Sequence, residues 1–191
     1  SHFDKQSFTL SYFDKKGEIR TLNLDRGITV VFNGKVAEQG LEEIFNMPHY
    51  ALKLISSDKK YDTAIVKAYE NYVVDIIDNH SAVVYDKEQP QRSLKMDSSL
   101  YDYMKITQAG SEVKFDNIEQ NMVLSAFMSK DSRYLEVVVT DYKIDGVLDG
   151  ISYDEDNIKL SVNGEKYIMP KDTVVENIPK AGDTVTLFMD C

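Results

Sequence analysis

Residues 122–140, Met-Val-Leu-Ser-Ala-Phe-Met-Ser-Lys-Asp-Ser-Arg-Tyr-Leu-Glu-Val-Val-Val-Thr, decide the fold class of this chain. Two runs rich in β-branched and other apolar residues flank a short polar segment, which is the pattern of a β-hairpin. Runs of similar alternation, bounded by polar turn residues, lie at 8–12, 19–24, 28–32 and 183–189. We therefore expect a mainly β protein.

The same order of features occurs earlier in the chain, about 70 residues upstream. Residues 22–25 (Leu-Asn-Leu-Asp) align with 94–97 (Leu-Lys-Met-Asp), and a strand, a glycine-containing turn, a turn-helix, a strand and a polar hairpin follow in both copies. The paired segments are 33–35 with 109–111, 41–44 with 115–118, 50–55 with 122–127, and 56–60 with 129–133. A repeat of this length suits a small β module rather than a solenoid repeat.

The repeat also settles an ambiguous segment. Tyr61, Ile65 and Tyr69 fit one face of a helix, yet residues 63–69 align with the plainly extended run at 135–140. We therefore predict a strand at 63–69. A short helix is expected over 37–46, where apolar residues share one face before Pro48.

A third, partial copy follows the second. Residues 145–149 and 160–168 match the opening hairpins, 175–178 match the turn-helix, and 183–189 match the next strand. The closing strand has no match, which we interpret as truncation at Cys191. Ser1 and His2 are interpreted as a cloning remnant. The predicted architecture is three tandem small antiparallel β-barrel or β-sandwich modules, each with one short helix, at 3–70, 71–142 and 143–191, the third partial.

Composition limits the classes of partner. The 191 residues carry 22 Lys and Arg against 32 Asp and Glu, a formal net charge of -10, and this sign repels nucleic acid and anionic lipid. Apolar runs fall far short of the roughly 20 residues that span a bilayer. We expect no nucleic-acid partner and no membrane insertion. A single Cys excludes an internal disulfide framework and a Cys-ligated zinc site.

Catalytic patterns are missing from the sequence. It contains no G-x-S-x-G, H-E-x-x-H, G-x-G-x-x-G or phosphate-cradling glycine loop. His49 follows a proline and His80 lies in a tight turn, where solvation is the usual state. Cys191 has no nearby basic partner to activate it. We predict no catalytic residue, no cofactor-binding residue, no metal ligand and no enzymatic activity.

Two ligand hypotheses remain alongside that prediction. Asp154, Glu155, Asp156 and Asn157 cluster after Asp149, and Asp145 precedes them, so carboxylate oxygens suited to calcium gather near the start of the third module. The EF-hand pattern, with Gly at its sixth and Glu at its twelfth position, is not met. We expect a solvated acidic hairpin without a tight calcium site. Twelve Tyr and eight Phe suggest sugar stacking, but Trp is absent and Tyr in strands usually packs.

Several segments resemble β-rich stalk modules of large surface proteins from Gram-positive anaerobes and their relatives, many of which also carry S-layer homology domains. The resemblance lies in Tyr-Glu-Asn-Tyr-Val-Val-Asp at 69–75, Val-Tyr-Asp-Lys at 84–87, the hairpin at 123–140, and residues 147–162, 164–167 and 181–187. These motifs are structural, so the resemblance transfers no catalytic residue.

The resemblance implies a spacer at the cell surface, outside the cell, in a parent protein anchored through segments absent here. Its partners would be neighbouring domains of the parent chain and other surface proteins. The alternatives are an accessory module that binds carbohydrate or protein, or a structural protein of a virion or its tail. An enzyme ranks third.

Overall fold

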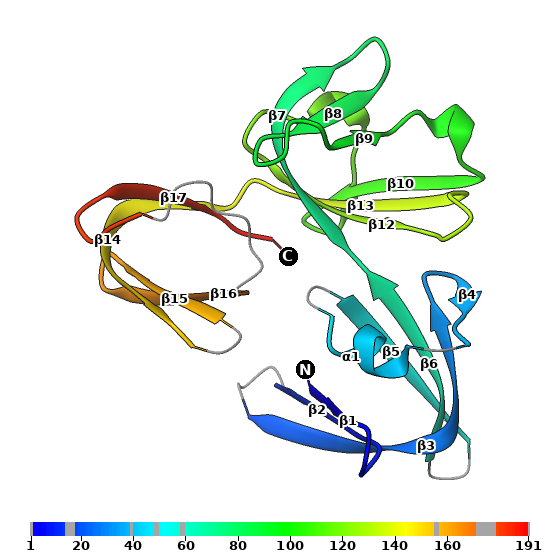
Figure 1. Cartoon of the computed structure of the whole chain (residues 1–191). Coiled ribbons are helices and arrows are strands. Elements are labelled where there is room, and N and C mark those ends of the chain that lie inside the picture. Colours follow the sequence, from blue (N-terminus) through cyan, green and yellow to red (C-terminus); the bar gives the residue numbers. More distant parts are fainter. Residues whose placement is uncertain are drawn as a thin grey trace. The chain divides into compact units, whose positions relative to one another are not determined.

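The computed structural model describes residues 2–13, 18–38, 40–47, 50–57, 60–154, 157–170 and 179–190 (Figure 1). Strands predominate in this part of the chain and form three sheets, which confirms the mainly β prediction. The chain divides into two compact units. The first unit contains residues 1–70 and 127–135, and the second contains 71–126 and 136–191.

The first sheet has the strand order β1-β2-β3-β6-β5, with β4 paired to β3 (Figure 1). Its long strand β3 pairs with β2 through its first half and with β6 through its second. His2, which the sequence assigned to a cloning remnant, opens β1 and pairs with Ser11. The elements are β1 (His2–Asp4), β2 (Thr9–Phe13), β3 (Ile19–Phe32), β4 (Lys35–Val36), α1 (Leu41–Phe45), β5 (Tyr50–Ser57) and β6 (Lys60–Ala68).

The strand predicted at 63–69 is confirmed, because β6 covers Lys60–Ala68. β6 pairs with β5 in the antiparallel sense, but with β3 in the parallel sense, from Thr29 opposite Thr63 to Phe32 opposite Val66. This parallel pair is an exception within the mainly antiparallel arrangement expected from the sequence. The 27 residues between β3 and β6 are long enough for the crossover that a parallel pair requires.

The helix expected over 37–46 is shorter and begins later, at Leu41. Two features before it prevent an earlier start. Lys35–Val36 pairs with β3, and the amide of Ala37 donates to the carbonyl of Val30 at 2.8 Å. Gly40 then takes the left-handed conformation with φ 81°, so the chain turns into the helix only at the next residue.

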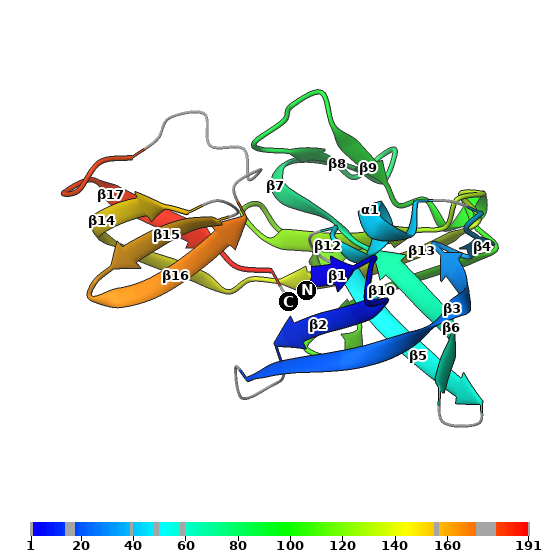
Figure 2. The same cartoon turned by 60° about the horizontal axis from the view of Figure 1, so that its bottom comes forward.

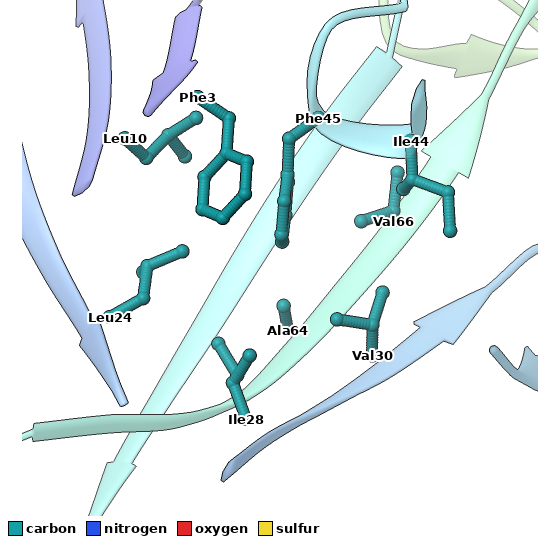
Figure 3. Packing of buried hydrophobic residues seen from close by; sticks show 9 residues of the cluster. All are labelled: Phe3, Leu10, Leu24, Ile28, Val30, Ile44, Phe45, Ala64 and Val66. Atoms are coloured by element: carbon teal, nitrogen blue, oxygen red, sulfur yellow. The ribbon is translucent and has the colours of Figure 1, made fainter. Parts of the chain in front are cut away.

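The first core lies between this sheet and α1 (Figure 3). Phe3 from β1 and Phe45 from α1 meet with ring centroids 5.2 Å apart. The amide of Phe3 also donates to Asn46 Oδ1 at 2.8 Å, so the end of α1 is bonded to β1. In the described residues β1 and β5 are the ends of an open strand order, and the sheet does not close into a barrel.

The second sheet has the order β11-β10-β13-β12-β7-β8-β9. A single 3-10 turn, η2, occupies the place that α1 holds in the first sheet, so the short helix expected in this module is reduced to one turn. Its elements are β7 (Glu70–Asp78), β8 (Val83–Asp86), β9 (Ser93–Lys95), η1 (Ser98–Leu100), β10 (Tyr103–Gln108), β11 (Ser111–Glu112), η2 (Phe115–Asn117), β12 (Val123–Met128) and β13 (Tyr134–Thr140).

The third sheet, of order β16-β15-β14-β17, is antiparallel throughout. Its buried residues are Leu148, Ile158, Leu160 and Val162. The turn-helix expected at 175–178 lies outside the described residues. The strands are β14 (Lys143–Tyr153), β15 (Asn157–Val162), β16 (Glu165–Pro170) and β17 (Thr184–Phe188).

The first two sheets repeat the same turn between their opening strands. An aspartate carboxylate accepts the backbone amides two and three residues later, and the residue after them has a positive φ and accepts an amide through its carbonyl. The matched pairs are Asp4 with Asp78, Ser7 with Ser81, Phe8 (φ 57°) with Ala82 (φ 51°), and the amide donors Leu24 with Met96.

The glycine-containing turns of the two sheets also match. Each turn contains two consecutive residues in the left-handed conformation. The residue that follows the short strand after the turn, β4 or β11, donates its amide to a carbonyl of the strand before the turn, β3 or β10. The pairs are Asn33 (φ 46°) with Ala109 (φ 47°), Gly34 (φ 81°) with Gly110 (φ 79°), and Ala37 N to Val30 O (2.8 Å) with Val113 N to Ile106 O (3.0 Å). The strand orders β4-β3-β6-β5 and β11-β10-β13-β12 are therefore equivalent.

The third sheet repeats part of the second. In each sheet, a residue in the middle of one strand, β7 or β14, forms two backbone hydrogen bonds with the two residues that precede a later strand, β12 or β17. The first of those two residues has a positive φ in both sheets. The bonds are Val74 N to Met122 O (2.9 Å) and Asn121 N to Val74 O (2.8 Å), and Leu148 N to Asp183 O (2.9 Å) and Gly182 N to Leu148 O (2.8 Å). Thus β9-β8-β7-β12 corresponds to β16-β15-β14-β17.

Candidate functional site

The histidines and the cysteine singled out from the sequence do not form a site in the described residues. His80 is exposed in the turn between β7 and β8, and its backbone amide donates to Asp78 Oδ1 at 2.9 Å. The turn uses the backbone of His80 and leaves its imidazole in solvent. His49 and Cys191 lie outside the described residues.

The acidic residues considered for calcium are engaged within the third sheet. Asp149 Oδ2 accepts the amide of Gly164 at 2.6 Å and the hydroxyl of Ser161 at 3.2 Å. Asp145 Oδ1 accepts the hydroxyl of Thr186 at 2.6 Å. Both carboxylates therefore fasten neighbouring strands to β14.

Asp154 closes the turn between β14 and β15. Its Oδ1 accepts the amide of Asn157 at 2.7 Å, and its Oδ2 lies 2.9 Å from Lys159 Nζ. Glu155 and Asp156 lie outside the described residues. Among the residues that the structure describes, no three His, Cys, Asp or Glu side chains are grouped to hold a metal ion.

The exposed tyrosines are spread over the sheets. The five most exposed lie one to an element, on β2, β10, β13, the connection after β13, and β14. They are Tyr12, Tyr103, Tyr134, Tyr142 and Tyr153. No single strand therefore presents a row of tyrosines, which is what a stacking platform built on one strand would need.

Four aspartates in turns share one electrostatic feature. A serine hydroxyl and at least one backbone amide donate to each carboxylate, and these hydrogen bonds hold the pKa below its usual value of 3.8. They are Asp4 (Ser7), Asp78 (Ser81), Asp97 (Ser99) and Asp131 (Ser129). Their role is to close turns.

These lowered pKa values predict a loss of stability in acid. Because the folded state favours the ionised carboxylates, their contribution is present above pH 3.8 and is lost as the pH falls from there through the lowered values. Urea unfolding midpoints, measured at pH values from 6 to 3, should therefore fall as the pH drops below 3.8. A variant with Asp→Asn at all four positions should show a smaller fall, and an unchanged fall would contradict the assignment.

The most elaborate polar cluster surrounds a buried carboxylate that the sequence analysis did not identify. Asp86, at the end of β8, is 3% exposed, and its Oδ2 lies 3.1 Å from Arg92 Nη1. Its Oδ1 accepts the amides of Val73 at 3.4 Å and Glu88 at 3.1 Å. The signal available in the sequence is alternation, since Asp86 falls on the same buried face as Val84.

Arg92 reaches three different groups from the loop after β8. Besides Asp86, its Nη1 donates to the carbonyl of Asn71 at 3.1 Å, and its guanidinium carbon lies 4.1 Å from the ring centroid of Tyr72. The pair therefore ties the loop at 87–92 to the start of β7. Both carboxylate oxygens of Asp86 accept hydrogen bonds within this cluster.

Comparisons with family models, with curated proteins and with solved structures found no match. No helix among the described residues has the length and apolar character needed to cross a membrane.

Proposed function

We propose that this chain is a non-catalytic spacer region of a bacterial cell-surface protein. The observation that carries the proposal is the repetition of one β unit in series. The second sheet repeats two turns and the strand order β4-β3-β6-β5 of the first, and the third sheet repeats the order β9-β8-β7-β12 of the second. Serial copies of one module can extend a protein without a larger common core, because the stability of each copy comes from its own core and from contacts with adjacent copies.

The connections between the sheets support a spacer. Only Tyr69 separates β6 from β7, and only Asp141 and Tyr142 separate β13 from β14. Flexible linkers between domains are usually longer and rich in Gly, Ser or Pro. The net charge of -10 suits a region exposed to water.

The cellular setting is tested by surface labelling. Antibodies raised against this chain should label intact cells of the source organism, and brief protease treatment of intact cells should remove that label. The matched control is an antibody against a cytoplasmic protein, which should label only permeabilised cells. Labelling of this chain only after permeabilisation would overturn the proposed location.

The non-catalytic role is tested by activity and ligand screens. Ester, phosphate and glycoside substrates should show no turnover with the purified chain. Turnover that His80→Ala abolishes would show an enzyme instead. Binding to a polysaccharide array that Tyr142→Phe preserves and Tyr142→Ala removes would show an accessory binding module.

A further inference from the structure

Strand β17 ends the third sheet, whereas the equivalent strand of the second sheet lies inside its sheet. β12 lies between β7 and β13, while β17 has one neighbour, β14, among the described strands. Figure 2 labels β17 in red and β14 in yellow within the third sheet. The correspondence of β14 with β7 and of β17 with β12 follows from their matched hydrogen bonds. The position next to β17 is therefore the one that β13 fills in the second sheet.

The burial of the two strands differs in the way this position predicts. With a constant offset of 61 residues, 123–128 aligns with 184–189, and both segments end in Phe-Met. Val123, Leu124 and Ala126 are at most 4% exposed. The aligned Thr184 is exposed, and Val185 and Leu187 are only half-buried. The segment that contains β17 thus shares the Phe-Met ending of the inner strand β12 but has the exposure of an end strand.

The chemistry of β17 also favours pairing. Proteins usually protect an exposed end strand with charged residues, proline or a bulge. The other end strand of this sheet, β16, carries Glu165 and Lys166 and ends at Pro170. β17 reads Thr-Val-Thr-Leu-Phe and has no charge and no proline, and its register with β14 is regular.

The backbone of β17 presents donors on the side away from β14. The amide of Met189 donates to the carbonyl of Tyr142 at 3.1 Å, and the carbonyl of Asp183 accepts the amide of Leu148. The backbone hydrogen-bonding groups of the odd-numbered residues of this segment therefore point toward β14. Because amides along an antiparallel strand alternate in direction, those of Thr184, Thr186 and Phe188 point away from it.

We propose that β17 accepts an antiparallel β-strand from a neighbouring β module, as β12 accepts β13; this step rests on the proposed spacer function. The occupant is an extended segment with the pattern of β13, whose Leu135, Val137 and Val139 alternate with other residues and are at most 2% exposed. Backbone hydrogen bonds supply the affinity in strand addition, and alternate side chains supply the specificity. The interaction would join consecutive modules through a shared sheet.

The test uses a soluble peptide that contains residues 134–140, Tyr-Leu-Glu-Val-Val-Val-Thr, and the full chain. Amide hydrogen exchange is measured by NMR with increasing peptide. At a peptide concentration ten times the Kd, exchange at Thr184, Thr186 and Phe188 should slow about tenfold. A control peptide in which Leu135, Val137 and Val139 are each replaced by Ser should leave these rates unchanged.

Two variants of the chain locate the contact. Thr186→Pro removes an amide that points away from β14, and should abolish the slowing at Thr184 and Phe188. Thr186→Val is the matched control, because it also loses the hydroxyl bonded to Asp145 but keeps the amide, and it should bind the peptide like the parent chain. If Thr186→Pro does not fold, Thr184→Pro, at the first residue of the strand, makes the same test.

Two results would overturn the proposal. One is unchanged exchange at β17 with saturating peptide. The other is concentration-dependent dimerisation of the chain alone that protects the same amides, since a second copy would then be the occupant. These readouts concern β17 only, whereas surface labelling and activity screens test the spacer function, so failure of either hypothesis is seen separately.

Discussion

Arg92→Ala is expected to lower the free energy of unfolding of the second unit by about 3 kcal/mol, the lower end of the range for removing one partner of a buried ion pair. The substitution leaves the carboxylate of Asp86, which is 3% exposed, without its cation. It also removes the contact with the Tyr72 ring and the donor to the Asn71 carbonyl. The Arg92 side chain is itself 30% exposed, which is why the lower end applies.

The measurement is urea unfolding followed by tyrosine fluorescence and circular dichroism. Lys159→Ala is the matched control in the same unit, because Lys159 pairs with Asp154 on the surface, where the two side chains are 52% and 38% exposed. Surface pairs contribute about 0–1 kcal/mol, so this variant should unfold close to the parent. Equal destabilisation by the two substitutions would show that the Asp86–Arg92 pair is no more important than a surface pair.

Arg92→Lys separates charge from shape. Lysine keeps the positive charge but cannot reproduce the planar stack on Tyr72 together with hydrogen bonds to two groups. We expect its stability to fall between those of the parent and Arg92→Ala. Parent-like stability would mean that charge alone holds the loop at 87–92.

The repeated turns explain why the β fold could be predicted from the sequence. Alternation identifies strands locally, and the repeat corrects the one segment, 63–69, where local periodicity favours a helix. The repeat gives the right prediction because equivalent segments of a repeated fold have the same secondary structure. Apolar residues at helical spacing can also occur by chance in a strand whose two faces are both partly buried.

Features that depend on pairing across the chain could not be predicted. Residues 19–24 and 28–32 look like two strands in the sequence because Asp25, Arg26 and Gly27 separate them. They form one strand, β3, in which Asp25 Oδ1 accepts the amide of Gly27 at 2.8 Å. The parallel pairing of β3 with β6 likewise depends on long-range contacts, which periodicity does not report.

The buried carboxylate was missed for a related reason. A hydrophobic pattern shows only that position 86 faces inward, and a charged residue there contradicts the pattern until its partner is known. The partner, Arg92, is six residues away across a proline-containing loop. Only the fold brings the two side chains and the start of β7 together.

Phe45→Ala is expected to lower the free energy of unfolding of the first unit by about 3–5 kcal/mol, the cost of removing a buried aromatic side chain. Phe45 is fully buried and packs beside Phe3, with the ring centroids 5.2 Å apart (Figure 3). The helix that carries it has five residues, Leu41–Phe45, too few to be stable alone in water. Its position therefore depends on Phe45 and the neighbouring Ile44.

Ile19→Ala is the matched control in the same unit, since Ile19 is 68% exposed and should contribute little to the core. Phe45→Leu should fall between Phe45→Ala and the parent, because leucine fills part of the volume. Urea unfolding measures all three variants, and hydrogen exchange locates the change. If α1 anchors the unit, Phe45→Ala should also speed exchange at Phe3, whose amide is bonded to Asn46 at the end of the helix. Unchanged exchange at Phe3 would show that β1 is held without α1.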